Sequence, residues 1–451
     1  MAAAARTAQT RTRAQTVIVG LGRTGLSCAR YLARRGEAFA VTDSRREPPE
    51  LKHLHELAPQ APVHVGGFDT TLLDGAALVI ASPGVSLREP FLVEAARRSI
   101  PIVGDIELFA RNATAPIAAI TGTNGKSTVT TLVGAFAEAA GLEVRVGGNL
   151  GEPALDLLAG PPAAMYVLEL SSYQLETTWS LQPEAAAVLN VSPDHFDRYH
   201  DLAEYAAAKA RIYERAATAI VNLDDGIVVR MPRPGQRTVG FSLCRSDADF
   251  RLLREAGEDW LAEGAEPILP LAALALPGRH NAANALAALA VGSVCGFPRA
   301  AMAGVLQEFR GLAHRTERVR DRRGVSWIDD SKGTNVGAAV AAIEGMDGPL
   351  VLIAGGEGKG QDFTPLGPAC QGKVRQAILI GRDARLLAAA LEGRCAVRFA
   401  ASMEEAVGAA DSVAQAGDTV LLSPACASFD MFRDYAQRGE AFAAAVRELA
   451  P

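Results

Sequence analysis

The sequence lacks the features that mark membrane proteins and disulfide-rich secreted proteins. No apolar run reaches the ~18 residues that a membrane-spanning helix needs. The six cysteines are scattered and include no Cys-x-x-Cys pair, which predicts reduced thiols in a cytosolic protein and no zinc or disulfide framework. Residues 1–14 consist mostly of Ala, Arg, Thr and Gln, with no apolar signal core after them. We therefore expect a disordered tail on a cytoplasmic protein.

Long runs of Lys or Arg are also missing, and the formal net charge is -6 at pH 7. This charge gives no electrostatic support for binding nucleic acid or an acidic membrane. What the chain does have is length and apolar content. Its 451 residues, 49% of them hydrophobic, are enough for about three domains of ~150 residues with separate cores.

Apolar strand patterns alternate with helical patterns along most of the chain, which predicts three α/β domains with largely parallel sheets. Residues 231–276 are irregular and are expected to form a small antiparallel appendage. The expected boundaries are a tail at 1–14, a Rossmann-like domain at 15–109, a central P-loop ATPase-type domain at 110–313 and a second Rossmann-like domain at 314–451.

The most informative motif is a Gly-rich turn that follows the apolar stretch 116–120 and opens a helical pattern. Such a turn cradles phosphates with backbone N–H groups, while Lys126 neutralises charge and the Ser127 hydroxyl ligates Mg²⁺. The strict P-loop pattern has Gly where Ile120 stands, so this motif is a variant. It predicts an ATP site formed by Gly122, Thr123, Asn124, Gly125, Lys126, Ser127 and Thr128.

A second Gly-rich turn, Gly20-x-Gly22-x-x-Gly25, follows an apolar strand, and Asp43 ends the next strand. Alone this pattern indicates an NAD site, although a plain strand–helix turn or a site for another nucleotide diphosphate gives the same spacing. The phosphate loop one domain later disfavours a simple dehydrogenase. Gly84, in a Ser-Pro-Gly turn after a neighbouring strand, can line the same crevice.

Three further side chains are ambiguous from the residues alone. Glu169 ends a buried strand beside the phosphate loop, where a carboxylate holds Mg²⁺ or caps the next helix. His195 shares a loop with Asp194 and Asp197 and is either a metal ligand or structural. Lys209 lies in a predicted helix over residues 202–217, where a lysine by default runs its stem along the surface and exposes its amine.

Polar loops also follow three predicted strands of the last domain, at 329–335, 355–360 and 423–430. Because parallel strands end at one edge of a sheet, these loops predict a small-molecule pocket. Asn284, near the start of a predicted helix, can bond a purine or serve a capping role.

In their order along the chain these motifs resemble the Mur ligases of peptidoglycan synthesis. The resemblance covers residues 16–439 and includes Thr121-Gly-Thr-Asn-Gly-Lys-Ser-Thr128, the Glu169 strand and Asp330-Ser-Lys-x-Thr-Asn335. Within the family it is greatest to the branch that adds D-glutamate, on Gly147-Gly-Asn-Leu-Gly151 and Leu422-Ser-Pro-Ala-Cys-Ala-Ser-Phe-Asp430. The Asp-Asn-Pro-Arg turn of the diaminopimelate- and lysine-adding members is absent here.

The resemblance implies an ATP-dependent, monomeric, cytoplasmic ligase. ATP would phosphorylate the carboxylate of UDP-N-acetylmuramoyl-L-alanine, and the D-glutamate amine would attack the acyl phosphate. It also implies two Mg²⁺ ions, and a carbamate on Lys209 formed by adding CO₂ to the neutral amine, an anionic oxygen ligand for Mg²⁺.

The resemblance assigns roles to particular residues. Catalysis would fall to Lys126, Glu169, His195 and Lys209, and metal binding to Ser127, Glu169, His195 and carbamylated Lys209. The UDP-sugar would contact Thr24, Asp43, Arg45, Gly84 and Asn149, and ATP would also contact Asn284, Arg315 and Asp330. D-glutamate would contact Lys332, Thr334, Lys359, Ser428, Phe429 and Tyr435.

Alternative functions remain open at the level of sequence. One is a ligase of the same fold that adds a different amino acid, and another is a nicotinamide dehydrogenase that uses the first Gly-rich turn. A third is a non-catalytic UDP-sugar-binding relative, against which the intact Lys126, Glu169 and Lys209 argue.

Overall fold

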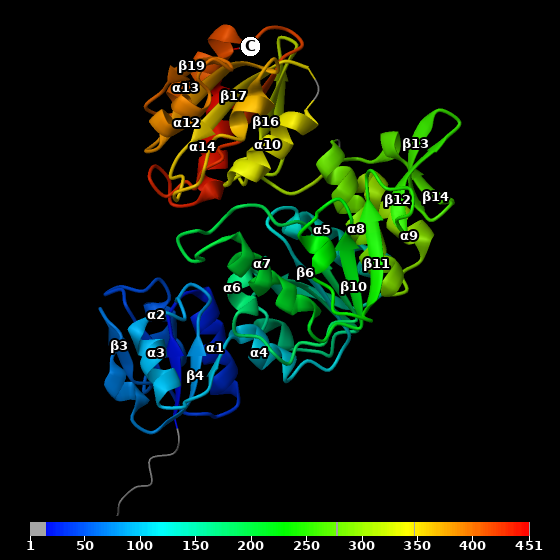
Figure 1. Ribbon diagram of the computed structural model, residues 1–451. Helices are drawn as coiled ribbons and strands as arrows, with labels where there is room; N and C mark the ends of the chain where they lie inside the picture. Colours follow the sequence, from blue (N-terminus) through cyan, green and yellow to red (C-terminus); the bar gives the residue numbers. More distant parts are fainter. Residues whose placement is uncertain (1–14, 277, 347, 451) are drawn as a thin grey trace, which may run out of the picture. The chain divides into compact units, whose positions relative to one another are not determined.

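The computed structural model describes residues 15–276, 278–346 and 348–450, so the tail expected at 1–14 lies outside the described residues. Its strands form three sheets, of five, nine and six strands (Figure 1). The three sheets confirm the expected α/β fold with three domains. Among the described residues, no helix is both long enough and apolar enough to cross a membrane.

The first sheet is fully parallel and has the strand order β3-β2-β1-β4-β5, which matches the first five strands of the Rossmann order 3-2-1-4-5-6. Each crossover between its strands contains a helix or a 3₁₀ turn. The elements are β1 (Gln15–Val19), α1 (Arg23–Arg34), β2 (Phe39–Asp43), α2 (Leu51–Leu57), β3 (Val63–Val65), β4 (Ala76–Ala81), α3 (Pro90–Arg97), β5 (Ile102–Val103) and α4 (Asp105–Ala110).

The second sheet has the order β14-β13-β12-β11-β10-β9-β6-β8-β7. Its strands are β6 (Ile117–Thr121), β7 (Val144–Gly148), β8 (Met165–Glu169), β9 (Ala185–Val188), β10 (Thr218–Asn222), β11 (Arg237–Ser242), β12 (Phe250–Glu255), β13 (Glu258–Glu263) and β14 (Glu266–Pro270). The pairs β12–β13 and β13–β14 are antiparallel, as expected for residues 231–276. In the same range, β11 pairs parallel with β10 and β12, so these strands extend the main sheet and do not form a separate appendage. Its helices are α5 (Lys126–Ala139), α6 (Ser172–Leu175), α7 (Leu202–Ala210), α8 (Arg279–Val294) and α9 (Arg299–Glu308).

The helix expected over 202–217 is shorter than predicted. The α-helix α7 ends at Ala210, and a 3₁₀ turn follows over Arg211–Tyr213. The Arg211 side chain donates hydrogen bonds to the carbonyl oxygens of Leu175 and Thr178, each over 2.7 Å. These hydrogen bonds hold Arg211 against the segment 175–178, and the α-helix does not continue beyond Ala210.

The third sheet has the order β15-β16-β20-β17-β18-β19, parallel except for β15. Alternate residues of its strands pack on opposite faces, against α10, α11 and α12 on one face and α13 and α14 on the other. The elements are β15 (Glu317–Arg322), β16 (Val325–Asp329), α10 (Val336–Gly345), β17 (Leu350–Gly355), α11 (Leu366–Cys370), β18 (Val374–Ile380), α12 (Ala384–Ala390), β19 (Ala396–Phe399), α13 (Met403–Val413), β20 (Thr419–Leu422) and α14 (Tyr435–Glu448).

The chain divides into two compact units. The first contains the described residues up to Ala119 together with Leu142–Ala186 and Arg211–Ala217. The second contains Ile120–Gly141, Ala187–Ala210 and the described residues from Thr218 onward. The Rossmann-like N-terminal sheet therefore lies in the first unit, and the phosphate loop and the C-terminal sheet lie in the second.

Substitution of Gly25 by Ala is expected to destabilise the protein. A methyl group on Gly25 would lie 2.0 Å from the Gly20 carbonyl oxygen, so the turn between β1 and α1 would have to open. We expect Gly25→Ala to lower the free energy of unfolding by about 1–3 kcal/mol in denaturant titration. Gly408→Ala is the control, because Gly408 is also inside a helix but has no atom within 4 Å of the added methyl. It should be neutral or stabilising by about 0.5–1 kcal/mol, and equal stability of both variants would contradict this packing.

Candidate functional site

A cavity of about 630 Å³ lies in the first unit, at the carboxyl ends of β1, β2 and β4. Ligands of open α/β sheets bind at this edge. The structure brings all five predicted UDP-sugar residues to its wall: Thr24, Asp43, Arg45, Gly84 and Asn149. Ser82, from the Ser-Pro-Gly turn expected at this crevice, also lines it, as do Ser171, Tyr173 and Gln174, which were not predicted as sites. The signal that could have found the last three is their position directly after the Glu169 strand.

Asp43 organises the mouth of this cavity. Its carboxylate accepts hydrogen bonds from the backbone N–H of Leu21 over 2.6 Å and from the Arg45 guanidinium over 2.6 and 2.9 Å. Burial favours the protonated acid, but the bonds from Arg45 and Leu21 outweigh burial and lower the pKa of Asp43. Asp43 is therefore ionised at neutral pH and holds Arg45 in place. Arg23, on the same wall, donates to the Gly151 carbonyl oxygen over 2.7 Å.

The phosphate loop has the predicted strand–turn–helix layout, from the end of β6 to the start of α5 at Lys126. Gly122 and Gly125 have positive φ angles of 154° and 82°, which only glycine adopts without strain. Gly125 is also closely packed, since a methyl group there would lie 2.3 Å from the Asn284 side-chain oxygen. The glycine at 125 is therefore needed both for the turn and for the approach of Asn284.

Two asparagines that sequence reasoning did not single out hold this loop. Asn190, after β9, accepts a hydrogen bond from the Asn124 backbone N–H over 2.8 Å and donates to the Asn124 carbonyl oxygen over 3.1 Å. Asn335 caps α10 and also donates to the side chains of Asn124 and Asp194, over 3.1 and 3.2 Å. The available signal was a polar residue in the loop after each strand, which does not tell which loop that residue will contact.

Two lysines converge on one carbonyl group of the loop. Lys126 Nζ and Lys209 Nζ each donate to the Gly122 carbonyl oxygen over 2.8 Å. Lys209 is 1% exposed and its ammonium lies 4.5 Å from the centre of the Tyr205 ring. The default expectation of an exposed amine is therefore wrong, because the helix turns Lys209 toward the loop.

A second cavity, of about 360 Å³, adjoins the phosphate loop within the second unit. The predicted ATP residues that line it are Asn124, Gly125, Thr128, Asn284, Arg315 and Asp330. Arg315, just before β15, donates to the Ser127 hydroxyl at the start of α5 over 2.6 Å. This hydrogen bond links the two segments within the second unit. Apolar Leu189, Phe241 and Leu276 line the same cavity, which suits a flat heterocycle.

Glu169 ends a strand and His195 lies in the loop that follows β9, as predicted. Glu169, 2% exposed, ends β8 in the first unit and accepts a hydrogen bond from the Asn149 amide over 2.5 Å. His195 lies in the second unit with a φ angle of 59° beside Asp194. Burial lowers the pKa of His195, which leaves a neutral imidazole able to ligate a metal at neutral pH.

A group of metal-ligating side chains that was not predicted lies at the start of the C-terminal domain. His314, Glu317 and Asp329 offer ligand atoms within 4.8 Å of one another. These atoms already bond one another or the nearby backbone: His314 Nδ1 lies 2.7 Å from Asp329 Oδ2, and Glu317 accepts from the His314 N–H over 2.9 Å. The group therefore serves to fix the chain as it enters β15, and we assign no metal to it.

The three polar loops of the last domain lie side by side, as predicted, because they follow the neighbouring strands β16, β20 and β17. Glu357 and Ala427 exchange two backbone hydrogen bonds of 2.9 Å and tie two of the loops together. Of the six predicted D-glutamate residues, Lys332 lies 4.0 Å from the Tyr435 ring centre and Lys359 lies 5.9 Å from that of Phe429. Ser428 is 3% exposed, and Thr334 follows Lys332 on the β16 loop.

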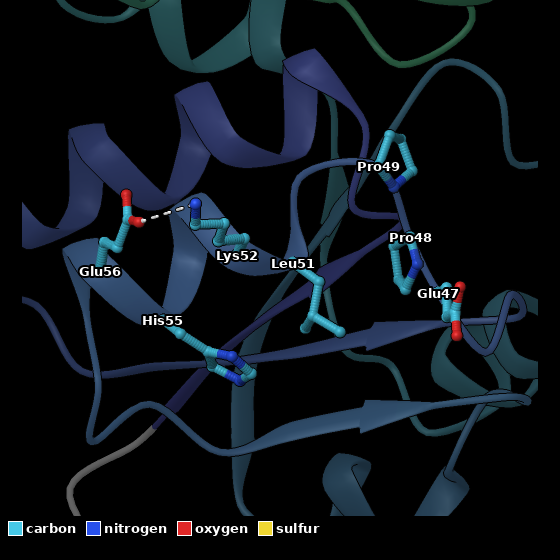
Figure 2. A pocket seen from close by; sticks show the side chains of 7 residues that line it. All are labelled: Glu47, Pro48, Pro49, Leu51, Lys52, His55 and Glu56. Carbon is cyan, nitrogen blue, oxygen red and sulfur yellow. Dashed lines mark ion pairs between the residues drawn. The ribbon is translucent and has the colours of Figure 1, made fainter.

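A further hollow, of about 550 Å³, is formed by α2 and the loop before it. Figure 2 shows Pro48 and Pro49 in that loop and the ion pair of Lys52 with Glu56 on the helix, at 4.0 Å. None of the predicted site residues lines it, and most of its side chains are exposed. We place no ligand there.

The fold and the two glycine-rich turns define a nucleotide-binding α/β protein with three domains. Three family models match the chain in order: Mur ligase MurD-like, N-terminal domain, over residues 14–104; Mur ligase middle domain over 120–292; and Mur ligase, glutamate ligase domain, over 314–426. The chain therefore belongs to the Mur ligase family, whose members are ATP-dependent ligases of peptidoglycan precursor synthesis.

Individual proteins agree with this assignment. The chain is 53% identical over 444 residues to the UDP-N-acetylmuramoylalanine--D-glutamate ligase of Nitrosococcus oceani, covering 98% of each chain. It is 52% identical over 439 residues to the protein of that name from Pseudomonas aeruginosa, covering 96% of this chain and 98% of the relative. The crystal structure of UDP-N-acetylmuramate-alanine ligase from Thermotoga maritima has the same fold, with a TM-score of 0.60 at 18% identity over 97% of this chain and 100% of that one.

Asp330 should make stability depend on pH. Burial raises its pKa from 3.8 to about 7, although the Ser423 hydroxyl donates to it over 2.8 Å. The folded protein therefore keeps this proton in a range where the unfolded chain has lost it. The stabilisation is complete below the unfolded pKa and is lost as the pH rises toward about 7.

Asp330→Asn should remove this contribution. We compare the melting temperatures of the ligand-free natural protein and the variant between about pH 5 and about pH 8. As the pH rises, the melting temperature of the natural protein should fall relative to that of the variant. A difference that stays constant with pH would show that Asp330 ionises normally in the folded state.

Proposed function

We propose that this protein joins D-glutamate to UDP-N-acetylmuramoyl-L-alanine with hydrolysis of ATP, through an acyl phosphate. The observation that carries the proposal is the phosphate loop with Lys126 and Lys209 on one carbonyl, beside a cavity lined by Asn284, Arg315 and Asp330. The relatives at 52–53% identity carry the name of this activity along nearly their whole length. A cytoplasmic, monomeric state is part of the proposal and rests on the sequence alone.

The chain's own residues supply binding and charge for phosphoryl transfer. The N–H groups of the phosphate loop and the ammonium of Lys126 hold the ATP phosphates, and this positive charge favours the anionic transition state. The guanidinium of Arg315, held at the Ser127 hydroxyl, adds a second cation. In the first unit, Arg45, fixed by Asp43, and the N–H groups at the Gly20 turn hold the UDP group of the other substrate.

Two of the three donor side chains are oxygen ligands of the kind that Mg²⁺ prefers, and the third is a nitrogen ligand. Ser127 offers a hydroxyl, Glu169 a buried carboxylate and His195 a neutral imidazole. Bound Mg²⁺ would neutralise charge on the phosphoryl oxygens. We propose two such ions and a carbamate on Lys209, which would convert the buried amine beside Gly122 into an anionic oxygen ligand.

D-glutamate carries two carboxylates, and the loops after β16, β17 and β20 offer cations to match. Lys332 and Lys359 come from two of these loops and Ser428 from the third. Hydrogen bonds and ion pairs from these groups would orient the amine of D-glutamate toward the acyl phosphate. Attack of the amine nitrogen on the acyl carbon would give a tetrahedral intermediate. Breaking of the bond between this carbon and the phosphate oxygen would then expel phosphate, and loss of a proton from the nitrogen would complete the amide.

Phosphate release with UDP-N-acetylmuramoyl-L-alanine and a panel of D- and L-amino acids tests the proposal. We expect ATP-dependent phosphate release and amide product with D-glutamate, and almost none with L-glutamate, lysine or diaminopimelate. Lys126→Met is the inactive control, since it keeps the length of the side chain and loses the charge. Preference for another amino acid would move the protein to a different branch, and absence of product with every amino acid would support a non-catalytic UDP-sugar-binding protein.

Ser428→Ala should weaken use of D-glutamate selectively. The lost hydrogen bond to a carboxylate is worth about 1.5–3 kcal/mol, so the KM for D-glutamate should rise roughly ten- to a hundred-fold with little change in the other two KM values. Ser412→Ala is a matched control, because its hydroxyl bonds the Ala409 carbonyl oxygen on the distant helix α13. A similar rise in all three KM values would indicate misfolding of the domain and no specific D-glutamate contact.

Lys209→Met should abolish most activity and leave the fold intact. The substitution keeps an apolar stem and removes the amine, which lies 4.5 Å from the centre of the Tyr205 ring and which a carbamate needs. We expect kcat to fall at least ~100-fold, because the variant would lack the carbamate proposed to bind a metal ion. Its melting temperature should stay close to that of the natural protein. Lys52→Met, at an exposed lysine of α2, is the control. Near-normal turnover of Lys209→Met would exclude the carbamate.

A further inference from the structure

Two cysteines that lie far apart in the sequence meet in the C-terminal domain. Cys370 ends helix α11 and is fully buried, and Cys395 directly precedes β19 and is partly exposed. Cys395 packs against the same apolar cluster that contains Cys370, Val374 and Leu391. The thiol of Cys370 forms a hydrogen bond with the sulfur of Cys395.

Contacts of the neighbouring residues hold the two segments that carry these cysteines together. Residues next to the two cysteines also touch, since the Arg394 guanidinium donates to the Gln371 side-chain oxygen over 2.5 Å. The carbonyl oxygen of Cys370 accepts from the Lys373 N–H over 3.1 Å. On the other side, Ala396 pairs with Gln376 where β19 joins β18. Both cysteines thus lie at the amino ends of β18 and β19, at the opposite edge of the sheet from the three ligand loops.

We propose that Cys370 and Cys395 form a thiol pair that is oxidised to an intramolecular disulfide by low-molecular-weight disulfides such as oxidised glutathione. Cys395 is the attacking group and Cys370 the resolving group. This modification site is independent of the proposed ligase activity, because neither residue lines the ligand cavities.

The roles follow from exposure and acidity. The hydrogen bond from Cys370 lowers the pKa of Cys395 and raises that of Cys370, so Cys395 carries the thiolate. Cys395 is also the member of the pair that solvent reaches. By contrast, burial raises the pKa of Cys28, and that of Cys426 to about 12, which makes these two thiols unreactive. Cys244 is exposed but is not one of this pair.

The reaction balances in two exchanges. The Cys395 thiolate attacks one sulfur of oxidised glutathione, the glutathione S–S bond breaks, and one glutathione leaves and takes up the proton that Cys395 gave up. Cys370 then loses its proton and attacks Cys395 sulfur, the mixed S–S bond breaks, and the second glutathione leaves as a thiol. Two protein thiols are oxidised and one small disulfide is reduced.

The experiment uses the full-length, fully reduced protein incubated with oxidised glutathione at a mildly alkaline pH. Intact mass and peptide mapping should show the loss of two hydrogen atoms and one cross-linked peptide containing Cys370 and Cys395, reversed by dithiothreitol. Cys244→Ser should leave this cross-link unchanged. Cys370→Ser should instead accumulate a stable glutathione adduct on Cys395, because the resolving thiol is missing.

The map of the natural protein decides the question even if a variant folds poorly. A stable adduct on Cys395 in the natural protein, a cross-link that joins a different pair, or six free thiols after the incubation would each overturn the proposal. A glutathione adduct that forms on Cys370 in the Cys395→Ser variant as fast as on Cys395 in the Cys370→Ser variant would overturn the assignment of Cys395 as the attacking group.

Discussion

Parallel pairing of strands is the constraint on which the functional surfaces of this protein depend. When neighbouring strands run the same way, every chain segment that leaves them does so at one edge, and polar residues far apart in sequence meet there. The loops after β16, β20 and β17 meet in this way in the C-terminal sheet. The turn after β1 lines one ligand cavity and the turn after β6 lines the other. Both turns contain glycines with positive φ angles, which other residues adopt only with strain.

One backbone oxygen holds two lysine side chains beside the phosphate loop. The Gly122 carbonyl accepts from both Lys126 and Lys209, which places two amines at the root of the loop. Such a concentration of positive charge favours a polyphosphate. A carbamate on Lys209 would change the sign of one of the two groups and so convert an anion site into one that also holds cations. In the function proposed above, Lys126 would then contact the phosphates and carbamylated Lys209 the metal.

Much of the fold could be predicted because the strong patterns are local. The strands that bear the Gly20 and Gly122 turns, the strand ending at Glu169 and the three C-terminal strands predicted before polar loops are present. The strands that were missed, β3, β5, β7 and β15, are short or lie at or next to a sheet edge, where apolar patterning is weak. The predicted helix around Lys209 was too long because Arg211 bonds a distant loop, and no local rule contains that contact.

The sequence by itself determined the glycine-rich turns, the strand-end carboxylates and the family, because each depends on residue types at fixed short spacing. Only the tertiary structure decided that Lys209 is buried against the Gly122 carbonyl, that Asn335 reaches Asn124, and that Cys370 lies beside Cys395. In each case the partners are separated by many residues, and their meeting depends on strand order and on helix packing. Residue spacing in the sequence does not reveal strand order or helix packing. Burial and hydrogen bonds depend on which residues are close in space.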